Sequence, residues 1–247
     1  MVEPVVLLDG RVTLYCGDCR EILPTIGGVQ AVCTDPPYGI QYVTNHRKNL
    51  ATPAMLAGDD NAPLWAVPMF ADMLRDGGAL YLATRFDVAE PWRAAIADSG
   101  LALKTPIFWD KGNWTAGDLD GDFGAQVEIF LFAHKGRHKF RGGRLANLWR
   151  VPRDPAGAHP TPKPVALMAQ MILCSTDPDG LVADGFMGSG STGVAAVKNG
   201  RRFVGVECNP EYFDIACRRI EEATKQPDFF VEPATKPKQE SMFGDAA

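Results

Sequence analysis

Short apolar runs alternate with helix-length segments along most of the 247 residues. The runs VQAVCT (29–34), GLVAD (180–184) and RFVGVE (202–207) have the length of buried strands, whereas 164–175 and 191–200 have the length of helices. Parallel strands need a crossover segment between them, and this segment is usually a helix. The alternation therefore predicts an α/β fold with a mostly parallel sheet that helices cover on both faces.

Turn and cap residues mark where the remaining elements begin and end. Asp9-Gly10 is a two-residue turn signal and predicts a hairpin within residues 5–16. Asp18 is placed to cap a short helix over 19–23. The other predicted elements are helices over 64–78, 87–100 and 209–223 and strands over 79–84, 101–109 and 125–133.

Composition narrows the class of protein. Apolar residues make up 46% of the chain, enough for one large domain or two small ones, and neither a run of eighteen apolar residues nor a signal-peptide pattern occurs. Of the six cysteines only Cys16 and Cys19 form a CxxC pair, so reduced thiols are favoured over a zinc site and no metal is predicted. The net charge of −5 does not by itself indicate a nucleic-acid binder, although the distribution of charge matters more than its sum.

A glycine-rich turn follows the predicted strand that ends at Asp184. In LVADGFMGSGSTGVAA the residues Gly188, Gly190 and Gly193 fit the pattern G-x-G-x-x-G, and Glu207 lies 19 residues beyond the first of them. Glycine lets the backbone approach a ligand, and the free N–H groups of a helix start bind anions. The pattern predicts a nucleotide-like ligand with Glu207 on its ribose. A structural glycine turn and a dinucleotide-binding oxidoreductase remain as alternatives.

The stretch AVCTDPPYGI ends another predicted strand in an unusual turn. Asp35 is followed by Pro36 and Pro37, which fix φ and lack N–H donors, and then by Tyr38. Such a turn cannot continue into a sheet or a helix interior. It would hold Asp35 and Tyr38 rigidly at the end of the strand, with the backbone carbonyls between them unpaired. Taken alone, it could also be a rigid strand-to-loop turn with a surface acid.

Four motifs in one order resemble a known family. YCGDCREIL, DPPY, HPTPKP (159–164) and ADGFMGSG are similar to the amino-group DNA methyltransferases that use S-adenosylmethionine, in the permuted group whose DPPY motif precedes the cofactor motif. The resemblance spans about residues 11–223 and includes RRFVGVECNPEYFDIACRRIEEA. One departure is Gly185, where the family usually has proline. The resemblance implies a mostly parallel, seven-stranded Rossmann-like sheet with helices on both faces and one antiparallel strand.

The resemblance gives the DPPY turn a chemical role. The exocyclic amine of a nucleobase is a poor nucleophile, because its lone pair is delocalised into the ring. The carboxylate of Asp35 and the carbonyl of Pro36 are expected to accept its two hydrogens, while Pro37 helps to lock their geometry. Tyr38 is expected to stack on a base that has been flipped out of the duplex. These four residues are the predicted catalytic set.

The same resemblance implies a site for S-adenosylmethionine. Asp18 is expected to accept a hydrogen bond from the adenine amino group, which is compatible with helix capping, and Glu207 to hold the ribose hydroxyls. Lys163 and Thr161 are expected near the methionine carboxylate. The predicted cofactor-binding set is Asp18, Asp35, Thr161, Lys163, Asp184, Phe186, Gly188, Ser189, Gly190 and Glu207.

Residues 134–153 contain seven Lys or Arg, two His and no acid. The run lies where the family places target recognition, which we assign to 136–158, and its cations are expected to meet phosphates. A second loop, 41–50, is expected to close over the flipped base. A short recognition segment predicts a short target site or a homodimer, whereas a merely solvated basic face is the alternative. The predicted DNA-binding set is Arg47, Lys48, Lys135, Arg137, Lys139, Arg141, Arg144 and Arg150.

The resemblance also sets the expected organisation and substrate. Residues 1–223 are predicted to form the catalytic domain and 224–247 a disordered tail. The aspartate before PPY favours adenine N6 as the target, with cytosine N4 as the alternative. A binding module, or a methyltransferase acting on RNA or protein, is a competing class. We expect a cytoplasmic enzyme, bacterial or phage-encoded, of the restriction–modification kind.

The tail carries one pattern twice. Gln226–Phe230 (QPDFF) and Gln239–Phe243 (QESMF) both run from a glutamine to large apolar residues, in a segment with few others. Exposed apolar residues lower solubility unless a partner covers them. Both pentapeptides resemble the short peptides that dock bacterial proteins on the replication sliding clamp, which is therefore a predicted partner. Two tethered copies would add avidity. Packing of the first copy onto the catalytic domain is the alternative.

Overall fold

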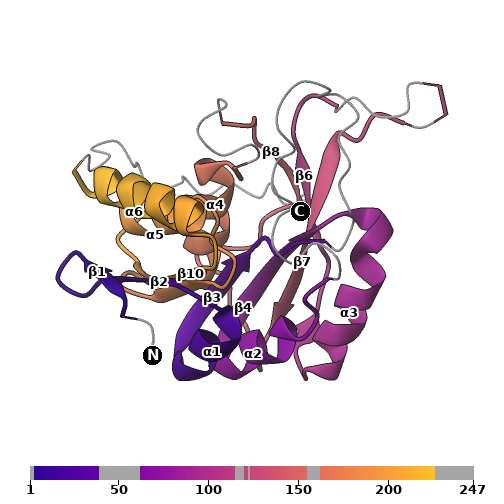
Figure 1. Cartoon of the computed structure of the whole chain (residues 1–247). Coiled ribbons are helices and arrows are strands. Elements are labelled where there is room, and N and C mark those ends of the chain that lie inside the picture. Colours follow the sequence, from indigo (N-terminus) through magenta and orange to yellow (C-terminus); the bar gives the residue numbers. More distant parts are fainter. Residues whose placement is uncertain (1–2, 39–61, 115–119, 122, 155–161, 226–247) are drawn as a thin grey trace, which may run out of the picture.

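The fold is built around a single mixed sheet. The computed structural model describes residues 3–38, 62–114, 120–121, 123–154 and 162–225. Within these ranges one sheet of ten strands has helices on both faces (Figure 1). The predicted tail motifs lie outside the described residues, and so do His159 and three predicted site residues: Arg47, Lys48 and Thr161.

The bounds of the elements follow the predicted alternation for most of the chain. The strands are β1 Val5–Leu7, β2 Val12–Cys16, β3 Val29–Thr34, β4 Leu74–Thr84, β5 Ala102–Leu103, β6 Ile107–Asp110, β7 Val127–His134, β8 Leu148–Arg150, β9 Leu181–Asp184 and β10 Arg202–Glu207. The helices are α1 Cys19–Ile22, α2 Ala66–Met73, α3 Ala89–Asp98, α4 Val165–Ser175, α5 Ser191–Lys198 and α6 Pro210–Lys225, with 3-10 turns at Leu23–Thr25 and Phe86–Val88. Across the described ranges, no helix combines the length and apolar character needed to cross a membrane.

The strand order is β1-β2-β10-β9-β3-β4-β7-β6-β8, and β5 pairs with β7. The five strands from β2 to β4 in this order are parallel to one another, so the predicted α/β class is confirmed. The described residues contain ten strands rather than seven and four antiparallel pairs rather than one antiparallel strand. The short strands β1, β5 and β8 have only two or three residues, too few to show a period in the sequence. Pro106 lies in the gap between β5 and β6, where a single strand was predicted.

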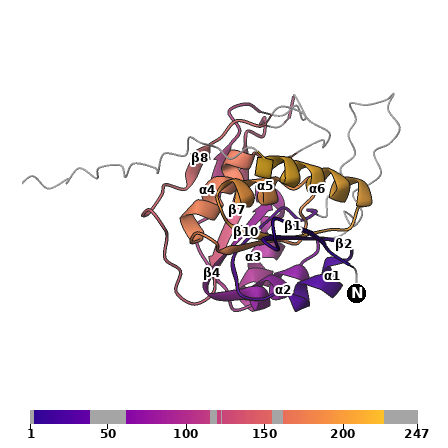
Figure 2. The ribbon, with the colours of Figure 1, turned by 90° about the vertical axis from the view of Figure 1, so that its left-hand side faces the viewer.

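Two apolar layers enclose the sheet. Figures 1 and 2 show α4, α5 and α6 on one face and α1, α2 and α3 on the other. Alternate residues of β4 pack into the two layers, because successive side chains of a strand point to opposite faces of the sheet. Leu80 and Leu82 pack with Phe70 and Trp92 on the α2 and α3 side, whereas Tyr81 belongs to the cluster under α4 and α5. Both faces of the central strands are therefore buried.

The helix predicted over 64–78 is shorter than expected. It ends at Met73, and Leu74 already pairs with Val29 of β3 at the start of β4. Gly77 has φ +75° and donates its N–H to the carbonyl of Lys135 at 2.9 Å. A Cβ on Gly78 would lie 2.8 Å from the carbonyl of Arg75 and 3.0 Å from that of Val29. The two glycines let the chain pass close to neighbouring backbones, and they do not close the helix.

The third glycine of the loop pattern has a packing role that can be tested. A Cβ on Gly193 of α5 would lie 2.8 Å from the ring of Phe203 and would press on Ile220 of α6. Helix propensity favours alanine by about 1 kcal/mol, but overpacking costs roughly 1–3 kcal/mol. We expect Gly193→Ala to lower the free energy of unfolding by about 1–2 kcal/mol in urea denaturation. The matched control is Gly27→Ala, whose Cβ meets nothing within 4 Å; a Gly193→Ala protein as stable as the control would contradict this account.

Candidate active site

The carboxyl ends of β2, β10, β9 and β3 meet at one edge of the sheet. Glu207 at the end of β10 is in register with Cys16 of β2, and Gly17 donates its N–H to the carbonyl of Glu207 at 3.0 Å. The neighbouring strands β9 and β3 end at Asp184 and Thr34. Ligands of open α/β sheets bind outside the carboxyl ends of the strands. This edge is therefore the candidate site.

Asp184 lies beneath the glycine loop and not on its surface. Its Oδ1 accepts from the Thr34 hydroxyl at 2.8 Å and from the backbone N–H of Phe186 at 3.1 Å, and its Oδ2 accepts from the Thr192 hydroxyl at 2.7 Å. The residue is 4% exposed. Burial raises the pKa of Asp184 to about 6, although the three donors act in the opposite direction. The carboxylate joins β3, the loop and α5, and protein groups supply these three donors.

The glycine loop and Glu207 hold each other in place. Gly188 and Gly190 have φ values of +50° and +82°, a conformation that favours glycine. Gly188 donates its N–H to Oε2 of Glu207 at 2.8 Å, and Asn209 donates its N–H to Oε1 at 2.9 Å. Each carboxylate oxygen has a second lone pair, and at Oε1 that lone pair faces only the weak thiol donor of Cys208 at 3.8 Å among the described residues. Glu207 is thus oriented by the backbone while keeping acceptor capacity for a diol.

Ser189 is buried within the loop and is held by Arg219, a residue that the sequence interpretation did not include. Arg219 of α6 donates to the Ser189 carbonyl at 2.6 Å and to its hydroxyl at 2.7 Å. Burial lowers the pKa of Arg219 from its ordinary value. The contact fixes the loop from the helix side, so Ser189 does not face the open edge freely.

Asp18 and Phe186 flank Glu207 at the same edge. The Asp18 side chain caps α1 by accepting from the N–H of Arg20 and also pairs with the Arg20 guanidinium, which keeps the pKa of Asp18 below its ordinary value. The same guanidinium lies 5.5 Å from the ring centroid of Trp65. The ring of Phe186 lies 6.3 Å from those of Trp65 and Phe70. A carboxylate pair with aromatic faces beside it suits a nucleoside.

Gly185 has a packing reason for its departure from the family pattern. A Cβ at this position would lie 2.9 Å from the ring of Phe70 and 3.3 Å from Leu23. The buried Phe70 ring thus occupies the space that a larger side chain would need. The glycine in place of the usual proline therefore fits the packing of this chain, and it does not remove a polar group from the loop.

Asp35, Tyr38 and Lys163 form a compact cluster just beyond β3. The ammonium of Lys163 lies 2.8 Å from Oδ2 of Asp35, and the Tyr38 hydroxyl donates to Oδ1 at 2.7 Å. Lys163 also lies 3.4 Å from the Tyr38 hydroxyl. Burial and the neighbouring Asp35 raise the pKa of Tyr38 well above its usual range, so the phenol is neutral. The structure brings Lys163 to the DPPY turn, whereas the sequence prediction placed it at the cofactor carboxylate.

Two further charged residues complete this cluster and were not predicted. Glu128 of β7 lies 3.3 Å from the ammonium of Lys163 and 3.1 Å from that of Lys111, which follows β6. The signal was available in the sequence, because Glu128 is the one acid in the apolar run AQVEIFLFA. A charged residue inside an otherwise apolar strand indicates a buried partner.

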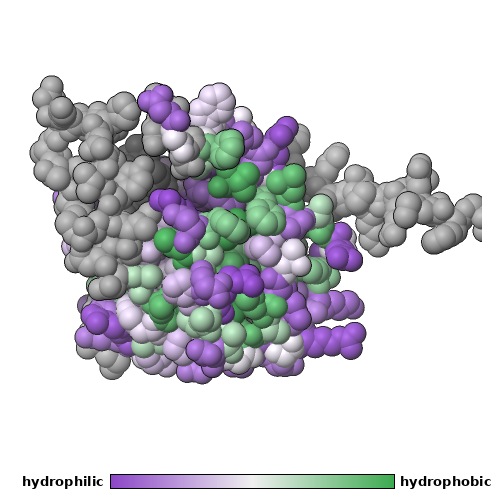
Figure 3. Space-filling model, turned by 90° about the vertical axis from the view of Figure 1, so that its right-hand side faces the viewer, coloured by the Kyte–Doolittle hydropathy of each residue, from purple (hydrophilic) through white to green (hydrophobic). Residues whose placement is uncertain are grey.

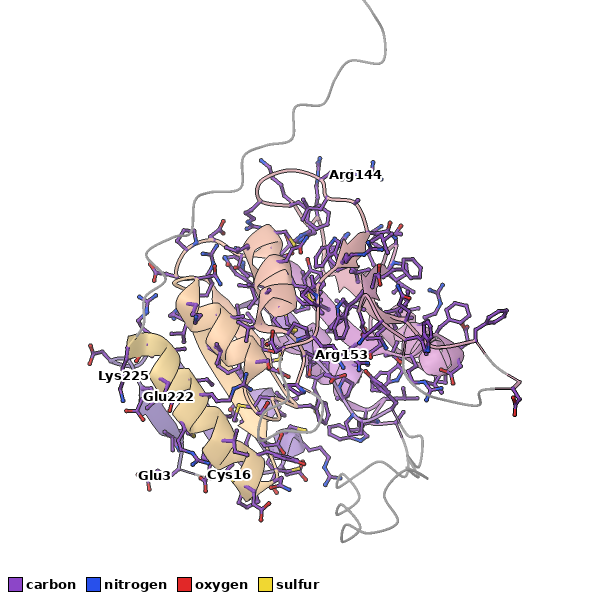
Figure 4. All side chains as sticks on the ribbon, turned by 90° about the horizontal axis from the view of Figure 1, so that it is seen from above. Glu3, Cys16, Arg144, Arg153, Glu222 and Lys225 are labelled. Atoms are coloured by element: carbon purple, nitrogen blue, oxygen red, sulfur yellow. The ribbon has the colours of Figure 1, made fainter. Side chains whose placement is uncertain are left out.

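The predicted DNA-binding residues of the basic run do not gather at this edge. Since Thr84 of β4 pairs with Ile129 and Ala79 pairs with His134, residues 135–144 begin about 17 Å from the carboxyl end of β4 along the strand. Figure 4 shows Arg144 at the edge opposite Cys16, with Arg153 between them. Strand β8 brings the chain back toward the carboxyl end of β6, because Arg150 pairs in register with Asp110.

Three of these predicted cations already bind protein groups. Lys135 donates to the carbonyl of Ala71 at 2.8 Å, Arg141 pairs with Asp177 at 2.9 Å, and Arg150 pairs with Asp110 at 2.7 Å. The other three described members of the set, Arg137, Lys139 and Arg144, are exposed. The described residues contain no group of three or more His, Cys, Asp or Glu that could hold a metal ion.

The fold and the site define a class of α/β protein in which a glycine loop, the acid it contacts and a carboxylate turn meet at the open edge of the sheet, an arrangement that suits a nucleoside-containing ligand. Comparison with known proteins then narrows the class. The family model described as DNA methylase, which covers N6 and N4 enzymes, matches residues 137–218. The type II methyltransferase M.XycI of Xanthomonas campestris pv. cyanopsidis is 36% identical, over 89% of this chain and 90% of that protein.

Two other similarities are more limited. The DNA adenine methyltransferase YhdJ of Escherichia coli is 42% identical over 83 residues, which are 32% of this chain and 28% of that protein. The crystal structure of the M1.HpyAVI–SAM complex superposes with a TM-score of 0.68 at 24% identity, over 85% of this chain and 98% of that chain. The chain belongs to the N6/N4 amino-group DNA methyltransferase family. The predicted class, a DNA methyltransferase of the restriction–modification kind, is confirmed.

The raised pKa of Asp184 predicts how stability depends on pH. The folded-state pKa of about 6 lies above the ordinary value of 3.8, so folding takes up a proton between these values. The free energy of unfolding therefore falls as pH rises through this window, by roughly 3 kcal/mol from this group. We expect the stability of the wild type minus that of Asp184→Asn to decline by this order between pH 4 and 6 in urea titrations. Parallel curves for the two proteins would contradict the burial of an ionisable group here.

Proposed function

We propose that this DNA methyltransferase transfers a methyl group from S-adenosylmethionine to N6 of an adenine flipped out of double-stranded DNA. The observation that carries the proposal is the hydrogen bond from Thr34 to Asp184, which joins the strand before Asp35 to the loop that faces Glu207. The DPPY turn, which would accept the hydrogens of the amine, and the glycine loop, which would contact the cofactor, are thereby held next to each other. This arrangement suits a reaction in which the base and the methyl donor must meet.

The residues at the edge fit the proposed cofactor. Glu207 keeps acceptor capacity for the two ribose hydroxyls, and the aromatic faces of Phe186 and Trp65 suit an adenine ring. Asp18 would accept from the adenine amino group once Arg20 yields part of its contact. When bound, S-adenosylmethionine supplies a methyl group on a sulfonium sulfur, which is a good leaving group.

Asp35 and Pro36 act on the target amine. Their carboxylate and carbonyl oxygens accept its two hydrogens, so the nitrogen lone pair is localised and directed toward the methyl group. A new N–C bond forms as the C–S bond breaks, and the electron pair of the broken bond stays on sulfur. The carboxylate of Asp35, whose side chain is 32% exposed, takes the proton that the nitrogen loses and passes it to water. Tyr38 offers its ring to the flipped base.

The choice of adenine rests on the residue before the two prolines. Asp35 stands before Pro36 and Pro37, and by the resemblance drawn from the sequence an aspartate there favours adenine, whereas a serine favours cytosine. The partial similarity to a protein named as a DNA adenine methyltransferase supports the same choice. Cytosine N4 is the second candidate, because the family model covers both bases.

DNA is proposed to approach over the open edge. Phe86, just after β4, and Trp114, after β6, are 83% and 67% exposed, and Figure 3 shows hydrophobic residues reaching the surface on the face at the right of Figure 1. Aromatic faces near a flipped base can stack or fill the vacated space. Within the proposed recognition segment 136–158, the part around β8 is better placed to contact DNA at this edge, because β8 carries the chain back toward it. Arg150 and Arg153 lie in this part. A homodimer and the clamp remain predictions.

Product analysis tests the substrate and the base together. The protein is incubated with double-stranded DNA and methyl-labelled S-adenosylmethionine, and the DNA is digested to nucleosides. We expect label in N6-methyldeoxyadenosine, and we expect Asp35→Ala to lose more than a hundredfold in rate while keeping cofactor affinity within threefold. Label in N4-methyldeoxycytidine would replace adenine by cytosine, whereas label only in RNA or protein would reject the DNA substrate. Turnover of Asp35→Ala within tenfold of the wild type would remove its proposed role.

Glu207→Ala tests the cofactor site. Loss of the carboxylate removes the acceptors for the ribose and leaves the N–H groups of Gly188 and Asn209 without their present partner. We expect calorimetry to show affinity for S-adenosylmethionine weakened by about 1.5–3 kcal/mol, the usual value of hydrogen bonds to a charged group. Glu211→Ala, an exposed acid in the first turn of α6, serves as the control. Equal affinity in the two variants would place the ribose elsewhere.

A further inference from the structure

Four charged side chains of alternating sign run from the buried residue that follows β6 to the DPPY turn. We call this set the charge chain: Lys111, Glu128, Lys163 and Asp35. The successive N–O distances are 3.1 Å, 3.3 Å and 2.8 Å. The side chain of Lys111 is the least exposed of the four, at 3%, and that of Asp35 is the most exposed, at 32%, whereas Glu128 and Lys163 lie between them at 21% and 13%.

The charge chain needs an explanation beyond stability. Burying ions removes them from water at a cost that their mutual attraction only partly repays, and apolar replacements of buried pairs are often neutral or stabilising. Here the ions also come from four separate places in the sequence: the end of β3, the segment before α4, β7 and the residue after β6. Such a set is more readily explained by the chemistry of the carboxylate at its exposed end.

Glu128 occupies the position that decides how Lys163 meets Asp35. Burial favours the neutral amine, but Asp35 and Glu128 outweigh it, and the pKa of Lys163 lies well above its usual range. The ammonium is therefore charged and shared between two carboxylates. It contacts Oδ2 of Asp35, while Oδ1 accepts only the Tyr38 hydroxyl among the described side chains.

We propose that Glu128 is a positioning residue for methyl transfer, acting on Asp35 through Lys163. By holding the ammonium on the Oδ2 side, it leaves Oδ1 of Asp35 for the target amine, which takes the place of the Tyr38 hydroxyl. Without Glu128, Asp35 is the one remaining anionic partner of the ammonium among the described residues, and the ammonium moves to bridge both carboxylate oxygens. The acceptor for the amine is then occupied. This inference rests on the proposed role of Asp35 in the reaction.

A pair of variants separates positioning from folding. Glu128→Gln alone would leave Lys111 buried without a carboxylate, so it is combined with Lys111→Met, which removes that charge. We expect the double variant to melt within a few degrees of the wild type, to bind S-adenosylmethionine within threefold, and to lose at least thirtyfold in kcat. Lys111→Met alone keeps Glu128 on Lys163 and is the matched reference, against which the loss of kcat in the double variant is counted. Glu128→Asp combined with Lys111→Met keeps the charge, and we expect it to recover part of the lost kcat.

A crystal structure of the double variant gives a readout that does not depend on activity. We expect the ammonium of Lys163 within hydrogen-bond distance of both oxygens of Asp35. An ammonium that stays on Oδ2 alone would overturn the inference, as would an unchanged kcat or a loss of kcat that follows the melting temperature. Absence of methyl transfer in the wild type would instead reject the proposed function, and the geometry of Lys163 would still decide the positioning.

Discussion

The buried carboxylate of Asp184 is the interaction on which the site depends. It accepts hydrogen bonds from Thr34 at the end of β3, from the backbone of the glycine loop and from Thr192 in the first turn of α5. These three donors belong to the strand before the DPPY turn, to the glycine loop and to the helix that follows the loop. One desolvated group thereby sets the spacing between the end of the strand that leads into Asp35 and the glycine loop that contacts Glu207. Its burial is unfavourable for the ionised form, which is the cost of that rigidity.

Much of the fold could be predicted from the sequence, because the central strands and the helices on both faces have clear periods. Thus α4 begins and ends within a residue of the predicted bounds, and Asp18 caps α1 as expected. The helix predicted over 64–78 was too long, because two glycines that usually end a helix serve here to pass close to other backbones. The short edge strands gave no signal, since two or three residues cannot display a period.

The site was predictable where residues are adjacent in sequence and less so where they meet by packing. Asp35 to Tyr38 and the glycine loop stand together in the chain, so their proximity to a strand end followed directly. The contacts of Lys163 could not be predicted in this way. Lys163 is 128 residues away from Asp35 and 35 residues away from Glu128 in the sequence, and these contacts depend on the register of β7. The basic run was interpreted from its charge alone. Charge does not encode where the run lies relative to β7 and β8. The pairing of these strands places the first half of the run at the other edge of the sheet.

The order of strands in the sheet has a consequence for how the protein folds during synthesis. β9 and β10, among the last elements of the described chain, lie between β2 and β3, which are among the first. While the ribosome is still adding residues up to about position 180, β2 and β3 have no strand between them and their inner backbone edges are unpaired. Such long-range parallel pairing is slow and leaves strand edges exposed until it is complete. The nascent chain therefore carries its DPPY turn for most of translation before the sheet that gives the turn its rigidity can close.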